Sequence, residues 1–597
     1  MKSPIRYYVA GAILSVIFVV LVGAQSVRPY NVVLSLIGGL MLYRYASGYL
    51  KEKEYADALR GTGTYHITYD ELPTDRMLVG RVFMWTPQYT NLINKYMQDK
   101  KLLETGATLG GLSFIHGVGI REEKDVCVEL PDLVGHDVTI GTTRVGKTKK
   151  YEVKIVQAIK RDETIIIMDP KGDRDLLNRT AEACRKYGRA KDFMFFALPY
   201  PRKSAYYNPL RNFTFPNEIP DRIAMLLPSG GASEGFRSFA WQVILAVTNA
   251  LLFLNIKPTI RLINEYSLTR TEELAIRCVK EAFNRKGRLT DLDGIKETDK
   301  VIEYAKTYNK TPEVHNEMIE ILLKIAQHPH EHFQKMTASL TPLLTKLATG
   351  EVGDIMSKTS DDGNDIDWER VVKNKKVVYM FFGTLLMRDT ARAVIRMAIQ
   401  DLMSFVGTKY CYLHDKNVLN LFIDEFTEVV DNSFVNLPNK AGGAGVRIYL
   451  ASQSVADMEA ELQSAAKAQQ IFDNLNTKTW LRVTDLATAK VFSDAAGTVP
   501  LQQESSGASV SPDMSDNDIA FKSSYSHNVS EKSVPLIDPS WLLKVPKGQG
   551  FSIISGRVFK IRVPLLQECK VNYLNELGIR DNETFEDDLP ETGGSEN

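Results

Sequence analysis

Residues 141–148 have the sequence GTTRVGKT, which matches the phosphate-binding pattern G-x-x-x-x-G-K-[ST]. In this pattern the backbone N–H groups face phosphate oxygens, the lysine contacts the β- and γ-phosphates, and the final hydroxyl contacts Mg²⁺. We therefore expect ATP and Mg²⁺ as ligands, with Lys147 catalytic and Thr148 at the metal. The predicted nucleotide-binding residues are Gly141, Thr142, Thr143, Arg144, Val145, Gly146, Lys147 and Thr148.

The sequence on either side of this loop has the pattern of a βαβ unit. A short strand is predicted at 137–140, a helix at 147–159 and a second strand at 165–168. A loop between a strand and a helix N-terminus favours anions, because the first N–H groups of the helix have no partner within it. This context favours nucleotide binding over a chance glycine-rich turn.

An acidic pair follows a second predicted strand. The apolar run 418–423 is typical of a strand buried in a parallel sheet, and it ends in Asp424 and Glu425. We predict that Asp424 is a metal ligand, acting through metal-bound waters, and that Glu425 orients the attacking water. The alternative is an ordinary strand end with two solvated acids.

Further strands are predicted at 377–382 and 446–451, and the second of them is followed by Gln453. A glutamine at this strand tip, close to the acidic pair, is predicted to sense the γ-phosphate or the attacking water. Residues 474–482 are predicted to form a turn that enters another strand. Strands that alternate with helices indicate an α/β fold with an open, mostly parallel sheet and the site along its carboxyl edge.

The composition adds limits rather than a function. The chain has 597 residues, with 73 basic and 73 acidic side chains, so its overall charge shows no preference for nucleic acid. Contact with DNA would require local basic patches. The five cysteines are scattered and not at metal spacing, which is typical of a reducing compartment without disulfides.

The N-terminal residues predict a membrane anchor. Residues 7–24 and 32–43 are two apolar runs separated by a short polar break. Basic residues precede the pair and follow it, so the positive-inside rule predicts two transmembrane helices with both ends in the cytoplasm. The competing interpretation is a cleaved signal peptide.

These patterns predict five regions. We expect a two-helix anchor at 1–50, a linker and lead-in at 51–130, a nucleotide-binding motor domain at 131–215 and 350–575, an all-helical domain at 216–349, and a disordered acidic tail at 576–597. Within the motor, residues 498–531 are Ser- and Asp-rich and predict a mobile loop, whereas 548–565 predict a final hairpin. The histidines at 328, 330 and 332 are interpreted as a solvated loop, not a metal site.

Several of these segments, in this order, resemble the conjugative coupling proteins, the membrane-anchored ATPases of type IV secretion. The resemblance rests on the predicted anchor, the 141–148 loop, the acidic pair and four short segments: Asp-Pro-Lys-Gly-Asp at 169–173, Tyr-Asn-Pro-Leu at 207–210, Ala-Ser-Gln-Ser at 451–454, and residues 474–482. Arg144 and Val145 stand where other members commonly have Gly-Ser. That difference, with residues 83–87 and 116–118, is similar to the TraD branch of integrative conjugative elements.

The resemblance implies a RecA-like P-loop motor with an inserted all-helical domain that faces the cytoplasm. It implies a homo-hexameric ring around a DNA channel, anchored in the bacterial inner membrane by more than one helix. It also implies an ATP hydrolase that receives a relaxase-linked single DNA strand and delivers it to the secretion channel. The implied partners are this DNA, the relaxase and relaxosome proteins, the channel components and the membrane.

In such a ring, ATP lies between subunits and a neighbour contributes an arginine to the γ-phosphate. Arg482 and Arg447 are both candidates, and either can instead be an ordinary salt-bridge partner. Arg144 either lies over the phosphates or faces the adjacent subunit. Asp169 either orients the metal sphere or shapes the turn, with Asp173 capping the next helix.

Two other functions remain open from the sequence. One is a double-stranded DNA translocase of the FtsK/HerA type, which shares the motor fold but usually has more membrane helices and a C-terminal winged-helix domain. The other is a nucleotide-dependent docking platform for secreted protein substrates. The complete set of Lys147, Thr148, Asp424 and Glu425 favours nucleotide turnover over simple docking.

Overall fold

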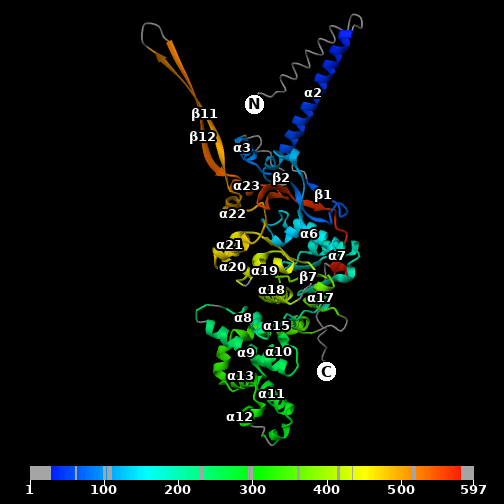
Figure 1. The fold of residues 1–597 in the computed structure, drawn as a ribbon, viewed down its shortest axis with the longest axis vertical. Helices are drawn as coiled ribbons and strands as arrows, with labels where there is room; N and C mark the ends of the chain where they lie inside the picture. The colour runs from blue at the N-terminus through cyan, green and yellow to red at the C-terminus, as the bar shows by residue number, and fades with distance from the viewer. Residues whose placement is uncertain are drawn as a thin grey trace, which may run out of the picture.

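The structure is a computed structural model, and it describes residues 29–60, 64–98, 103, 110–228, 230–231, 233–293, 295, 300–358, 363–412, 417–432, 434–513 and 520–579. The molecule is elongated. Helix α2 (Pro29–Arg60) and a long ribbon of β11 (Thr498–Asp513) and β12 (Ala520–Pro535) extend from one end (Figure 1). A helical region forms the opposite end, and a large sheet lies between the two.

The sheet has eleven strands and places the predicted site strands side by side. In spatial order they are β3 (Lys124–Glu129), β2 (Arg76–Met84), β14 (Arg557–Arg562), β13 (Gln549–Ile554), β10 (Thr477–Leu481), β4 (Asp137–Ile140), β9 (Val446–Ser452), β8 (Leu419–Ile423), β5 (Thr164–Asp169), β7 (Val377–Phe381) and β6 (Phe193–Ala197). All pairings from β10 to β6 are parallel, and those from β10 to β3 are antiparallel. The α/β class predicted from the sequence is confirmed.

Helices cover both faces of this sheet, which explains why its central strands are apolar throughout. Ile165 and Ile167 of β5 pack with α6 (Lys147–Lys160) and α7 (Arg174–Lys186). Ile166 and Met168 point to the other face and pack in the same cluster as the opposite set of helices. That set comprises α18 (Arg388–Cys411), α19 (Leu437–Ala441), α20 (Val455–Leu462), α21 (Ala465–Asp473) and α22 (Leu486–Ala496).

The helical region occupies residues 218–357, whose described part holds no strand. Its helices are α8 (Glu218–Ala224), α9 (Ser233–Phe253), α10 (Ile260–Leu268), α11 (Thr271–Arg285), α12 (Lys300–Asn309), α13 (Glu317–Ala326), α14 (His330–Met336), α15 (Leu340–Ala348) and α16 (Gly350–Ser357). The shorter helices near the sheet are α3 (Pro87–Tyr96), α5 (Phe114–Gly117), α17 (Trp368–Lys373), α23 (Pro539–Leu542) and α24 (Tyr573–Glu576).

The predicted anchor is only partly visible. The first apolar run, 7–24, lies outside the described residues, and the second, 32–43, lies within α2. Within the described ranges, the helix with the length and apolar character to cross a membrane is α9, and half of its apolar window is buried inside the protein. The core helix of a soluble protein can have the same length and apolar character, so α9 is no evidence for a membrane span. The two-helix anchor at 1–50 therefore stays a prediction.

Two sequence interpretations are corrected by the strands. Residues 51–130, expected as a linker and lead-in, contribute β1 (Tyr65–Ile67), β2 and β3, and the last two belong to the main sheet. Residues 498–531, expected as a mobile loop, form the ribbon of β11 and β12. This stretch is rich in Ser and Asp and lacks apolar alternation, so the sequence pattern does not reveal its strands. The predicted hairpin at 548–565 is confirmed as β13 and β14.

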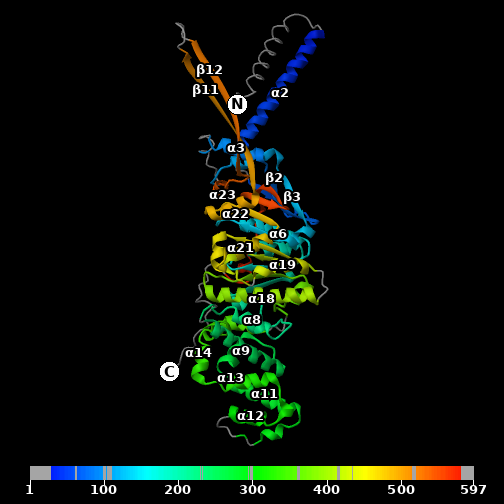
Figure 2. The same ribbon diagram turned by 60° about the vertical axis from the view of Figure 1, so that its left-hand side comes forward.

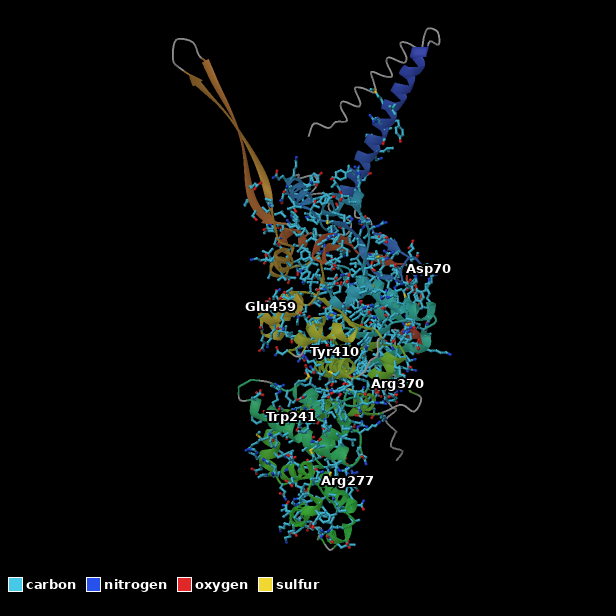
Figure 3. The ribbon with its side chains drawn as sticks, viewed as in Figure 1. Asp70, Trp241, Arg277, Arg370, Tyr410 and Glu459 are labelled. Carbon is cyan, nitrogen blue, oxygen red and sulfur yellow. The ribbon has the colours of Figure 1, made fainter. Side chains whose placement is uncertain are left out.

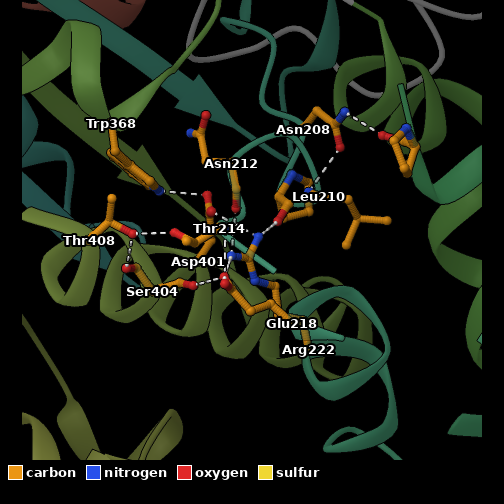
Figure 4. A network of polar contacts seen from close by, with 12 residues as sticks. Asn208, Leu210, Asn212, Thr214, Glu218, Arg222, Trp368, Asp401, Ser404 and Thr408 are labelled. Atoms are coloured by element: carbon orange, nitrogen blue, oxygen red, sulfur yellow. Dashed lines mark hydrogen bonds and ion pairs between the residues drawn. The ribbon is translucent and has the colours of Figure 1, made fainter. Parts of the chain in front are cut away.

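Helix α18 lies between the sheet and the helical region, as Figure 2 shows. At this junction Asp401 of α18 is fully buried and accepts three hydrogen bonds (Figure 4). Arg222 Nη1 donates to Oδ1 at 3.0 Å, and Oδ2 accepts from Tyr207 Oη at 2.9 Å and Trp368 Nε1 at 2.6 Å. Burial raises the pKa of Asp401 to about 7, and the Arg222 charge opposes this rise.

Arg222 of α8 joins the same network to the 207–210 segment. Its guanidinium also donates to Pro209 O at 2.7 Å and to Asn212 O at 2.6 Å. Asn208 closes the turn, since its Oδ1 accepts from Leu210 N at 3.0 Å and its Nδ2 donates to Pro258 O at 3.1 Å. The Tyr-Asn-Pro-Leu segment therefore ties the helical region to α18.

We predict that Arg222→Met destabilises the protein by about 3–5 kcal/mol, because it leaves the buried Asp401 carboxylate without its cation. Arg222→Met combined with Asp401→Asn should lower the free energy of unfolding by less, because asparagine is neutral and its side-chain oxygen still accepts hydrogen bonds from Tyr207 and Trp368. Thermal and urea unfolding measure both. Arg277→Ala, on α11 in the far part of the helical region (Figure 3), is the control and should change little. A double variant less stable than the single one would contradict this account.

Candidate functional site

The phosphate-binding loop has the backbone that its sequence predicts. It leaves β4 at Ile140 and enters α6 at Lys147. Gly146 has φ 112°, a conformation that side chains disfavour, and a Cβ on Gly141 would lie 2.9 Å from Val145 Cγ2. The loop therefore needs both glycines, and it leaves the N-terminal N–H groups of α6 facing outward.

Lys147 lies in the centre of the site and is 6% exposed. Its Nζ donates to Gly141 O at 2.7 Å and lies 3.7 Å from Glu425 Oε1. Burial lowers the pKa of Lys147 from its ordinary value, and the charges of Glu425 and Asp424 oppose this shift. The ammonium is thus held between the loop and the acidic pair.

The acidic pair lies at the carboxyl end of β8, two strands from the loop. Asp424 is 5% exposed, and burial, reinforced by Asp169 and Glu425, raises its pKa to about 7. Glu425 has φ 43°, an uncommon backbone for a residue with a side chain, and its N–H donates to Asp424 Oδ1 at 3.0 Å. The alternative of two solvated acids is wrong for Asp424.

Gln453 follows β9, the strand between β4 and β8. Its Nε2 donates to Glu425 Oε1 at 3.0 Å. The amide thus holds the same carboxylate oxygen that faces Lys147. The structure brings together Lys147, Asp424, Glu425 and Gln453, as the sequence predicted.

Asp169 lies next to this group but its bonds are local. Its carboxylate accepts from Gly172 N at 2.8 Å, Asp173 N at 2.6 Å and Tyr379 Oη at 2.6 Å. Burial raises the pKa of Asp169 to about 6. Asp173 caps α7 through Asp175 N and Leu176 N. These contacts favour the interpretation in which Asp169 shapes the turn.

The two arginine candidates lie at opposite edges of the sheet, Arg482 at the carboxyl ends of the parallel strands and Arg447 at their amino ends. Arg482 follows β10 beside the loop: its carbonyl accepts from Thr142 N at 2.9 Å, and its Nη1 donates to Gly110 O at 2.8 Å. Arg447 stands near the start of β9, is 5% exposed and pairs with Glu163 at 2.8 Å. These contacts favour the alternative in which Arg447 is a salt-bridge partner.

The loop and the acidic pair open into a cavity of about 670 Å³. Besides residues 142–149, Asp424 and Glu425, it is lined by Thr64, Tyr65, Lys171, Asp173, Asp175, Lys547, Gly548, Gln549, Arg562, Val563 and Leu565. A neighbouring cavity of about 510 Å³ shares Thr143, Lys171 and Glu425 and also contains Gln453 and Arg388. Arg144, with φ 59°, lines the larger cavity.

Sequence reasoning missed the residues that line this cavity from both ends of the chain. Lys171 had a signal, because it lies within the Asp-Pro-Lys-Gly-Asp segment. Tyr65 and Arg562 had no such sequence signal. They reach the cavity through pairing between strands that are distant in the chain, and no local sequence pattern marks such residues. Among the described residues, no group of three or more His, Cys, Asp or Glu side chains could hold a metal by itself. Mg²⁺ here would depend on the phosphates as well as on Thr148 and Asp424.

Comparison with protein families gives one match. Residues 418–547, which include Asp424, Glu425, Gln453 and Arg482, match the family described as the TraM recognition site of TraD and TraG. Over these residues the match agrees with the resemblance noted from the sequence. A sequence search of curated proteins finds no match.

The solved structures found by comparison include two forms of one coupling protein. The unbound bacterial conjugative coupling protein TrwBdeltaN70 has 14% identity and a TM-score of 0.49, over 74% of this chain and 88% of that chain. Plasmid coupling protein TrwB in complex with ADP and Mg²⁺ has the same identity and coverage, with a TM-score of 0.47. VirB4 of Thermoanaerobacter pseudethanolicus has 14% identity and a TM-score of 0.36, over 74% of this chain and 93% of that chain.

The geometry predicts that Lys147→Ala weakens binding of inorganic triphosphate by about tenfold or more, since it removes a buried ammonium from the loop. Isothermal titration calorimetry on the full chain in detergent measures the affinity. Lys335→Ala, an exposed charge change on α14, is the control and should bind as the wild type does. Equal affinities of the two variants would contradict the assignment of this loop as the phosphate site.

Proposed function

We propose that this protein is a membrane-anchored ATPase that couples a relaxase-bound DNA strand to a type IV secretion channel and drives its transfer in bacterial conjugation. The observation that supports it most is the grouping of Lys147, Asp424, Glu425 and Gln453 at one sheet edge, where Glu425 Oε1 lies 3.7 Å from Lys147 Nζ and accepts from Gln453 Nε2 at 3.0 Å. Residues 418–547 of the same chain match the TraM recognition site of TraD and TraG. A loop for triphosphate, a buried carboxylate and a held glutamate together suit phosphoryl transfer to water.

Each residue has a role that its contacts support. Residues 141–148 bind the phosphates through backbone N–H groups, and Lys147 adds a positive charge. Thr148 and Asp424 would hold Mg²⁺, which offsets the charge of the phosphates when it is bound. Glu425 orients and deprotonates the attacking water, and Gln453 keeps the Glu425 carboxylate in place through the 3.0 Å hydrogen bond.

The assembly extends this proposal. We assign residues 131–215 and 350–575 to a RecA-like motor, with the helices of 216–349 as its all-helical domain and 1–50 as a multi-pass anchor in the inner membrane. The motor acts as a homo-hexamer, in which Arg482, on the same sheet edge as the loop, contacts the γ-phosphate of a neighbouring site. The family match names a TraM recognition site, which supports a relaxosome protein as a partner.

We expect single-stranded DNA to stimulate ATP hydrolysis by the full chain in detergent, and Lys147→Ala to abolish the hydrolysis. A coupled phosphate-release assay with single- and double-stranded DNA measures this. Stimulation by duplex alone would favour the FtsK/HerA-type translocase. Hydrolysis unaffected by DNA, in oligomers verified by light scattering, would favour the docking platform for secreted proteins.

Glu425→Gln should lower the hydrolysis rate by about 10²–10⁴-fold while ATP still binds, because it removes the general base and keeps the shape of the side chain. Hydrolysis and ATP affinity are measured on the same preparation. Glu459→Gln on α20 (Figure 3), which lines neither cavity, is the matched control. Hydrolysis at the wild-type rate in Glu425→Gln would rule out this role.

A further inference from the structure

The larger cavity has a second wall that the phosphate chemistry does not use. One part of the cavity lining is the loop together with Lys171, Asp173, Asp175, Asp424 and Glu425. The other side consists of residues from both ends of the chain: Thr64, Tyr65, Lys547, Gly548, Gln549, Arg562, Val563 and Leu565. We call this second side the terminal wall. No carboxylate belongs to it, whereas an aromatic ring and two aliphatic side chains do.

The terminal wall is attached directly to the phosphate-binding loop. Gly548 N donates to Val145 O at 2.8 Å, and Val563 N donates to Gly548 O at 2.8 Å. A Cβ on Gly146 would lie 3.5 Å from Gly548 Cα. The wall therefore stands at a fixed place beside the loop, and any ligand whose phosphates occupy the loop lies next to it.

Parallel pairing of β1 with β15 (Pro564–Leu566) brings Tyr65 into this wall. Tyr65 is half-buried and stands opposite Pro564, and His66 stands opposite Leu565. The Arg81 guanidinium lies over the Tyr65 ring, 4.5 Å from its centroid. The Arg81 cation thus covers one face of a ring that also lines the cavity.

Arg562 supplies a fixed positive charge at the same wall. Its Nε donates to Glu123 Oε1 at 2.9 Å, and Glu123 also contacts His116 Nε2 at 3.1 Å. The guanidinium is 13% exposed, and the Glu123 carboxylate is 5% exposed. The terminal wall thus combines an aromatic and aliphatic surface with the Arg562 guanidinium, which the ion pair with Glu123 holds in place. This combination suits a planar base joined to a phosphate chain.

The two walls assign a direction to the nucleotide. Asp424 and Glu425 mark the end at which the terminal phosphate reacts, so the base lies toward the terminal wall. Resting on the proposed function, we propose that the Tyr65 ring stacks on the nucleotide base, with Leu565 completing the base subsite. Since Tyr65 lies in β1, the bound base contacts the first strand after α2.

The test compares ATP with inorganic triphosphate, which has the phosphates but no base. Affinities are measured by calorimetry on the full chain in detergent. Tyr65→Ala should weaken ATP binding by about tenfold, the scale of one base–aromatic stack, and leave triphosphate binding unchanged. Tyr65→Phe keeps the ring and should bind ATP as the wild type does. Tyr412→Ala, an exposed tyrosine outside the cavity, is the control.

The outcomes separate this inference from the proposed function. Wild-type ATP affinity in Tyr65→Ala, with Lys147→Ala defective, would overturn the base subsite and leave the phosphate site intact. Equal losses of ATP and triphosphate in Tyr65→Ala would also overturn it, because the ring would then support the loop and not the base. Failure of the wild-type chain to bind ATP would overturn both proposals.

Discussion

The parallel pairing of β4, β9 and β8 is the constraint on which the site depends. Their register places Ile140 beside Ser452, and Leu450 beside Ile423, so all three strands end at one edge. Each strand is followed at once by a polar segment: the phosphate-binding loop, Gln453 and the acidic pair. A parallel sheet requires this arrangement, because its strands share one carboxyl edge. Strand pairing thus brings together segments that lie far apart in the sequence.

The charges at this edge depend on one another. Burial disfavours the ammonium of Lys147 and the carboxylate of Asp424, and each opposite charge offsets part of that cost. Glu425 reaches both Lys147 and Gln453 from a left-handed backbone, a conformation that costs free energy for a non-glycine residue. Such a backbone conformation persists where surrounding contacts hold it, and here Asp424, Gln453 and Lys147 contact Glu425.

Helix α18 connects this edge with the helical region. Its first residue, Arg388, lines the smaller cavity together with Glu425 and Gln453. Farther along the same helix, Asp401 binds Arg222 of α8, Tyr207 and Trp368. The same helix therefore contacts both the smaller cavity and the helical region.

The sequence by itself determined the α/β class, the phosphate-binding loop, the acidic pair and Gln453. These features are local: a glycine pattern, an apolar run and the residue that ends it are all visible within ten positions. Tertiary structure alone decided that β2 and β3 enter the main sheet, that Arg447 is an ion-pair partner near the start of β9, and that Tyr65 and Arg562 line the cavity. Those outcomes come from pairings between distant strands, such as β1 with β15 and β14 with β2. The free energy that selects such pairings comes from burying both partners together, and no local stretch of sequence contains both of them.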